Sequence, residues 1–177
     1  MLEGTVSRLR AERENKPVPK KMPDTTVELR QDAYLDEDYI GNEGQKMEIY
    51  RRLAVAASEE ELTDLIDEVI DRFGSPSRPA ERLFLVSRIR VQARRLGIGS
   101  ILDEGQTLLI VWADEEPMRR WNMNRLPHSY MSKLHFLPGA PARVRIKKTD
   151  IQGNTAKWMS YFIEEITKEI YSGEKRA

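Results

Sequence analysis

Apolar and polar residues along positions 58–74 follow the spacing of an amphipathic helix. Ser58 is placed to cap the first turn, and Glu61, three residues later, completes a capping box. Gly74 and Pro76 follow the last apolar position and predict where the helix ends. The predicted buried face repeats every three or four residues and consists of Leu62, Leu65, Ile66, Val69, Ile70 and Phe73.

Three other segments show a helical period. One is 46–57, with apolar positions Met47, Tyr50, Leu53, Ala54 and Ala57. Another starts near Pro79, which is tolerated in a first helical turn, and its predicted inward positions are Leu83, Val86, Ile89, Ala93 and Leu96. The last begins near Asn154 or Thr155, and its apolar side comprises Trp158, Phe162, Ile163, Ile166 and Ile170.

Shorter runs predict strands at 25–30, 98–102, 107–113 and 142–147. Two of these runs flank a short acidic turn around Gly105, a pattern typical of a β-hairpin. Residues 115–138 are apolar at irregular intervals and are interrupted by prolines, so we expect short helices there. This order predicts an α+β fold in which three consecutive helices and a C-terminal helix pack on a small, mainly antiparallel sheet.

The chain divides by composition into an arm and a domain. Through Pro23 it carries six basic and three acidic residues, with three prolines, so 1–24 is expected to be a basic arm or linker. Residues 25–177 are expected to form the domain, because 177 residues suffice for one hydrophobic core and an arm.

Charge is segregated although its total is zero, with 29 basic and 29 acidic residues. Seven acidic residues and one arginine lie in 58–72, and Glu61, Asp64, Glu68 and Asp71 share one side of that helix. Arg72 lies one turn from Glu68. One interpretation is a solvated face with an ordinary ion pair. The other is a docking surface for a basic partner, since four carboxylates in one strip repel each other until cations meet them.

The next helix carries the opposite charge. Residues 78–95 contain six arginines and one glutamate, and Arg88, Arg94 and Arg95 are candidates for contact with nucleic-acid phosphates. Together with the basic arm they define the alternative hypothesis, a nucleic-acid-binding accessory domain. A further interpretation is that the acidic and basic helices pair with each other within the domain.

Catalytic and metal-binding patterns are missing from the sequence. There is no cysteine, the two histidines are His128 and His135, and no phosphate-binding glycine loop occurs. We therefore expect no enzyme activity, no metal site and no cofactor in this chain. No apolar run is long enough to span a membrane and no signal peptide is recognisable, so a soluble cytoplasmic protein without membrane contact is expected.

Several motifs in 25–101 occur in the order found in one protein family. They are Asp32-Ala33-Tyr34, Asp38-Tyr39-Ile40, Lys46, Tyr50-Arg51-Arg52-Leu53, Glu68, Asp71-Arg72-Phe73-Gly74 and Leu96-Gly97-Ile98. In this order the segment resembles the C-terminal regulatory domain (TRCF) of bacterial transcription-repair coupling factors. Leu35 and Gly41 stand where that family often has proline. Met1-Leu2-Glu3 also resembles the end of the preceding translocase module, so the chain is expected to be a fragment of a longer protein.

The resemblance implies a regulatory role. In that family the whole protein is an ATP- and Mg-dependent DNA translocase that displaces RNA polymerase stalled at damaged DNA and recruits nucleotide excision repair. The resemblance implies that this domain docks on the N-terminal UvrB-like module and masks the surface that binds UvrA. By position, Glu68, Asp71 and Arg72 are its candidate contacts, and the ATPase motifs lie outside this chain.

Overall fold

The computed structural model describes residues 24–172, and the predicted arm therefore lies outside the described residues except for Asp24. One five-stranded sheet is formed by β1 (Thr26–Glu28), β2 (Ile98–Asp103), β3 (Thr107–Trp112), β4 (Leu134–Leu137) and β5 (Arg143–Lys147). The strand order is β1-β2-β3-β5-β4. Only the pairing of β1 with β2 is parallel; the others are antiparallel. The expected mainly antiparallel sheet is confirmed.

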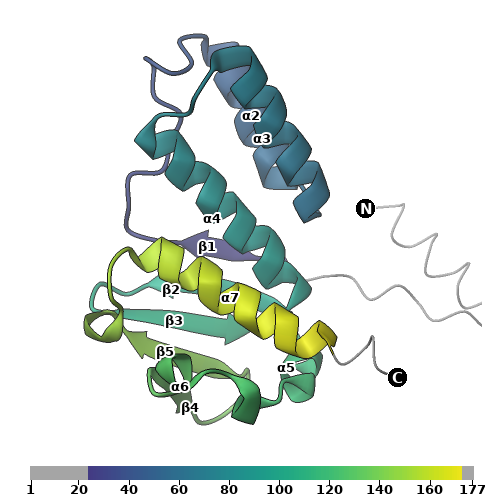
Figure 1. Ribbon diagram of the computed structural model, residues 1–177, viewed down its shortest axis with the longest axis vertical. Coiled ribbons are helices and arrows are strands. Elements are labelled where there is room, and N and C mark those ends of the chain that lie inside the picture. The colour runs from purple at the N-terminus through teal and green to yellow at the C-terminus, as the bar shows by residue number, and fades with distance from the viewer. Residues whose placement is uncertain (1–23, 173–177) are drawn as a thin grey trace, which may run out of the picture.

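The long helices of the described residues are α2 (Glu43–Val55), α3 (Glu59–Phe73), α4 (Arg78–Arg95) and α7 (Thr155–Ser172). Short helical turns are α5 (Glu116–Arg120), η1 (Met123–Arg125), α6 (His128–Met131) and η2 (Lys148–Asp150). In Figure 1, α4 and α7 lie beside each other next to the sheet, while α2 and α3 lie at the far end of α4. The predicted α+β class is confirmed, with α2 and α3 joined to the sheet through α4. No helix within residues 24–172 is long and apolar enough to cross a membrane.

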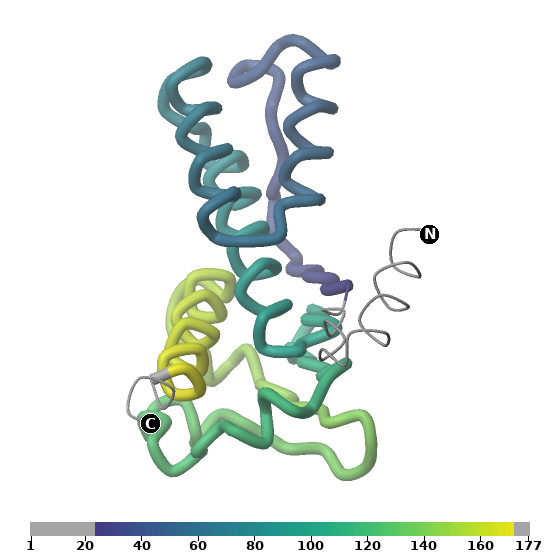
Figure 2. The backbone as a smooth tube through the Cα atoms, turned by 90° about the vertical axis from the view of Figure 1, so that its right-hand side faces the viewer, coloured from purple at the N-terminus to yellow at the C-terminus, as the bar shows by residue number. Residues whose placement is uncertain are grey.

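Two hydrophobic clusters make up the core, and α4 contributes to both. Ala80, Phe84 and Val91 belong to the cluster formed with α2 and α3. Ile89 and Ala93 belong to the cluster formed with the sheet and α7. Figure 2 shows the resulting shape, with the α2–α3 pair standing away from the sheet and α4 running between the two parts.

The predicted apolar face of α2 is confirmed at Leu53, which is buried, and in part at Tyr50, which is half-buried, but it is wrong at Met47, Ala54 and Ala57. Ile49 and Leu53 are the buried residues of this helix, whereas Met47 is 65% exposed and Ala54 is also exposed. The helix carries apolar residues on several sides, so the period alone did not single out the buried side. In α4, the predicted inward residues Leu83 and Val86 are only half-buried. The buried residues of this helix belong to two hydrophobic clusters on two of its sides, whereas the sequence predicted one buried side.

Residues 115–138 contain the expected short helices but also an unpredicted strand. Strand β4 pairs with β5, with Leu134 opposite Ile146 and Phe136 opposite Val144. It is a four-residue edge strand with a mostly exposed pattern, so its own sequence carries little alternating signal. The strand is defined by its pairing with β5, which the sequence of β4 alone does not predict.

Candidate protein interface on α3

The start of α3 is fixed by the predicted capping box. The Ser58 hydroxyl accepts a hydrogen bond from the Glu61 N–H at 3.1 Å, and the Glu61 carboxylate accepts one from the Ala57 N–H at 2.9 Å. Gly74 ends the helix at φ 82°, a left-handed conformation that favours glycine. The Glu61 carboxylate therefore supports the helix start, in addition to lying on the exposed surface.

Glu68 is held between two arginines. Arg52 of α2 donates to both carboxylate oxygens, at 2.9 Å and 2.6 Å, and Arg72 donates to one of them at 3.1 Å. The expected pair between Glu68 and Arg72 is thus confirmed, and a second partner joins it. The hydrogen bonds from Arg52 and then Arg72 outweigh partial burial and lower the pKa of Glu68 to about 2.

Arg72 is also positioned by aromatic residues at the end of α3. Its guanidinium carbon lies 5.1 Å from the centroid of the Phe73 ring. Phe73 in turn meets Tyr39 edge to face, with ring centroids 6.4 Å apart. The Tyr39 hydroxyl donates to the Gly74 carbonyl at 3.0 Å. The two groups that contact Arg72 are themselves held in place, Glu68 by Arg52 and Phe73 by Tyr39. The Arg72 guanidinium therefore has a defined position on the surface.

Three exposed aspartates lie beside this network, and we call Asp64, Asp67 and Asp71 the acidic face. Their spacing of three and four places them on one side of α3. Within residues 24–172 none of the three has an ion-pair partner, unlike Glu68. Their mutual repulsion is relieved when a basic surface docks against them. The surface of α3 therefore presents unpaired carboxylates next to an anchored guanidinium.

The predicted interface residues fall into two groups. Glu68 and Arg72 are joined directly, with Asp71 exposed on the same helix end, while Glu61 and Asp64 lie nearer its start. Sequence reasoning missed Arg52, although that residue belongs to the Tyr50–Leu53 motif. The signal was available in principle, because a short connection between two helices brings their facing sides together.

The arginines of α4 have separate surroundings. Arg95 lies 3.7 Å from Glu59 and stacks on the ring of Tyr171 at 5.3 Å. Arg94 has a buried Nε that receives no hydrogen-bond partner from residues 24–172, and Arg88 lines a groove. Of these three predicted contacts, Arg95 is exposed, whereas Arg88 and Arg94 are half-buried.

Another arginine of α4 has a structural role. Arg90 donates through Nη2 to the carbonyls of Leu53 and Ala56, at 2.7 Å and 3.1 Å, where α2 ends. Burial is the largest influence on this group and lowers its pKa. Pairing between the acidic helix and α4 occurs at Glu59, whereas Glu68 pairs with α2 instead.

Within the described part of the chain, no three histidine, cysteine, aspartate or glutamate side chains come together as a metal site. His128 starts α6 and His135 lies in β4, and both are exposed.

Comparison with known proteins identifies relatives of this chain. A Staphylococcus epidermidis transcription-repair-coupling factor is 40% identical over 111 residues, which is 63% of this chain and 9% of that protein. The Escherichia coli K12 transcription-repair-coupling factor is 29% identical over 168 residues, 94% of this chain and 14% of that protein. The chain therefore spans only a small part of the length of these curated relatives.

The fold comparison agrees. A crystal structure of the C-terminal domain of a transcription-repair coupling factor superposes with a TM-score of 0.67 at 18% identity, covering 85% of this chain and 96% of that one. The sequence model of the TRCF domain matches residues 29–122, more than half of the chain. This match contains α2, α3 and α4 with the Arg52–Glu68 pair. The chain belongs to the TRCF domain family, the C-terminal domain of bacterial transcription-repair coupling factors.

Proposed function

We propose that this domain is a non-catalytic regulatory clamp that docks on the N-terminal UvrB-like module of a coupling factor and masks its UvrA-binding surface. The observation that carries the proposal is the acidic face, whose three aspartates are exposed and unpaired within residues 24–172. Arg72 beside them adds a planar, anchored donor for a carboxylate of the partner.

The network around Glu68 supports docking in a specific way. Because Arg52 and Arg72 already satisfy the Glu68 carboxylate, Glu68 orders the surface and Asp71 is free to make the contact. A partner surface with basic residues would meet Asp64, Asp67 and Asp71, and an acidic residue among them would meet Arg72. Such a polar interface suits a latch that must release.

Release of the latch is then a shift between two populations. In the closed state the acidic face is covered and UvrA binding is blocked; in the open state both surfaces are free. In this proposal the translocase elsewhere in the parent protein uses ATP and Mg, contacts DNA and RNA polymerase, and biases the equilibrium. This domain itself needs no cofactor for that role.

The test measures binding of this chain to a separately expressed UvrB-like module from a coupling factor, by calorimetry. Asp71→Lys should abolish binding, because it reverses an unpaired charge of the acidic face next to Arg72. Glu68→Lys should also reduce binding, but through the loss of its bonds to Arg52 and Arg72. Asp150→Lys changes the net charge by the same amount on η2, away from α3, and should bind normally.

Circular dichroism of each variant establishes that lost binding does not come from lost folding. Binding that survives Asp71→Lys would move the interface away from α3 while leaving the clamp in place. No binding by the wild type, even with the two parts joined by a flexible linker, would overturn the docking proposal.

The nucleic-acid alternative has less support from the contacts of α4. Arg95 is engaged by Glu59 and Tyr171, and Arg90 is bound to carbonyls, so neither is available to a phosphate without losing these contacts. Salt-dependent DNA binding by this chain, lost on Arg88→Glu, would restore that alternative.

A further inference from the structure

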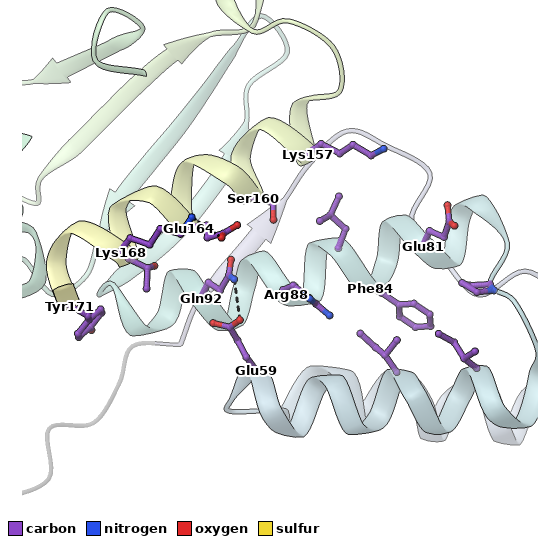
Figure 3. Close-up of a pocket in the computed structure, with 15 residues that line it drawn as sticks. Glu59, Glu81, Phe84, Arg88, Gln92, Lys157, Ser160, Glu164, Lys168 and Tyr171 are labelled. Atoms are coloured by element: carbon purple, nitrogen blue, oxygen red, sulfur yellow. Dashed lines mark hydrogen bonds and ion pairs between the residues drawn. The ribbon is translucent and has the colours of Figure 1, made fainter. Parts of the chain in front are cut away.

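A groove of about 950 Å³ runs along α4 between α3 and α7 (Figure 3). Its floor is one side of α4, with Phe84, Leu85, Arg88 and Gln92 at helical spacing. The α3 wall is formed by residues such as Ile66, and these are centred roughly 110° around the axis of α3 from the acidic face. The groove is therefore a second surface, separate from the proposed clamp contact.

Three helices define the shape of this groove. Helices α4 and α7 lie side by side and run in the same direction (Figure 1). At their C-terminal ends, the Tyr171 hydroxyl donates a hydrogen bond to the Arg95 carbonyl. At their N-terminal ends, Arg78 and Lys157 line one adjoining hollow of about 380 Å³. The α4 floor from Glu81 to Gln92 spans about 16 Å, which is about three helical turns. A fourth helix of that length would fill the trough formed by α3, α4 and α7.

The groove contains polar groups that the described residues leave without partners. Gln92 is 8% exposed, and its Nε2 donates to Glu59 at 3.2 Å, but its Oε1 is buried without a hydrogen bond. Figure 3 shows this side chain between α4 and α7 with its bond to Glu59. The side chain of Arg88 has neither a hydrogen bond nor an ion pair within residues 24–172. The buried Gln92 oxygen calls for a hydrogen-bond donor in the occupant, and the free Arg88 cation calls for an anionic group.

The charge balance of the groove favours an acidic partner. Glu164 and Glu59 already have cations, Lys168 at 3.0 Å and Arg95 at 3.7 Å. Lys157 is exposed and has no side-chain partner within residues 24–172. Glu81 also lacks one there, and it lines the adjoining hollow together with Arg78, Lys157 and Arg82, of which Arg82 lies 3.9 Å from Asp32. Among the charged lining residues that have no side-chain partner within residues 24–172, the cations Arg88 and Lys157 outnumber the anion Glu81.

We propose that this groove binds an amphipathic helix of another protein or module, with carboxylates flanking its apolar side. Its apolar residues would cover Phe84, Leu85 and Ile70, and its carboxylates would meet Arg88 and Lys157. An apolar floor suits a helix better than a nucleic acid. The ends of this chain outside the described residues fit poorly, since 1–23 carries six basic and three acidic residues and 173–177 carries two and one.

The probe is a fluorescein-labelled helical peptide of about 15 residues, with leucines on one side and glutamates beside them. A second peptide has lysines in place of the glutamates. Fluorescence anisotropy with this 177-residue chain should show binding of the acidic peptide only. Arg88→Glu combined with Lys157→Glu should weaken it by about tenfold or more. The control, Arg125→Glu with Lys147→Glu, makes the same charge change outside the groove and should leave binding within about twofold.

A variant that acts by shape separates docking from bulk charge. Ser160→Trp places an indole in the α7 wall and should block the acidic peptide while all charges remain. Equal binding of both peptides, or acidic binding that survives both groove variants, would overturn the proposal. Lack of acidic binding up to about 1 mM would overturn it too. A concentration-dependent dimer that Ser160→Trp abolishes would assign the groove to a second copy, also against the proposal.

Discussion

Both terminal nitrogens of Arg52 meet both carboxylate oxygens of Glu68, at 2.9 Å and 2.6 Å, and tie α2 to α3 beside the acidic face. The two residues are separated by 16 positions, and Arg72 joins them from the next turn of α3. A residue expected to contact a partner is thereby satisfied within its own domain. Substitutions at Glu68 alter the order of this surface as well as its charge.

The pH dependence of stability should carry a contribution from Glu68. Its pKa falls from an ordinary value of 4.5 to about 2 on folding, so its contribution is present above pH 4.5 and is lost as pH falls toward 2. Glu68→Gln should flatten the decline of the urea midpoint over this interval. Asp150→Asn, an exposed carboxylate without an ion pair in the described residues, should keep the wild-type slope. An unchanged slope in Glu68→Gln would contradict the role of the two arginines.

Asp103 should be a strong point of stability in the sheet. It is almost fully buried; burial raises its pKa, but Lys148 and the backbone N–H groups of Gly105 and Arg30 outweigh this and lower it. Lys148 donates to both of its oxygens, at 2.9 Å and 2.7 Å. Asp103→Asn should cost roughly 2–4 kcal/mol, because it leaves the lysine without its anion. Urea unfolding measures the change in the free energy of unfolding. A loss smaller than that caused by a substitution on the surface would contradict this prediction.

Arg90 should stabilise the end of α2, although it lies more than 30 positions further along the sequence. Arg90→Met keeps the apolar stem but removes the bonds to the carbonyls of Leu53 and Ala56. The expected loss is about 1–3 kcal/mol. Amide hydrogen exchange should accelerate in the last turn of α2 and remain slow in β3. Uniform acceleration throughout the domain would mean that Arg90 acts on the whole fold instead.

Association with a UvrB-like module should depend on salt through the acidic face. Neutralising Asp64 and Asp67 together, as Asp64→Asn and Asp67→Asn, should slow association severalfold at low ionic strength and reduce its dependence on salt. Dissociation should change less. Stopped-flow mixing at several salt concentrations measures both rates. An effect confined to dissociation would show that these aspartates act after docking and not during approach.

The sequence predicted those elements whose signals are local. In α3, the cap at Ser58, the stop at Gly74 and the apolar period coincide, and the structure confirms each of them. The β2–β3 hairpin was equally well marked by its turn around Gly105. Local signals of this kind need no knowledge of the partner element.

Features that depend on a partner element escaped prediction. Met47 and Ile49 are both apolar, and only the packing of α2 on α3 decides that Ile49 is the buried one. Arg52 and Glu68 meet because α2 and α3 lie side by side (Figure 1 and Figure 2), which no spacing within either helix encodes. The groove beside Arg88 likewise exists only because α7 returns to α4 from the far end of the chain.

Because α4 is one continuous helix, it can act as a rigid lever between the sheet and the α2–α3 pair. Its 18 residues extend about 27 Å, and its two sides contribute to the two hydrophobic clusters. A tilt of about 10° at the sheet end would carry the other end about 5 Å sideways, together with the helix pair that holds the acidic face. A load applied to that pair is likewise transmitted along α4 into the sheet, so the domain turns a small rotation at one end into a large displacement at the other.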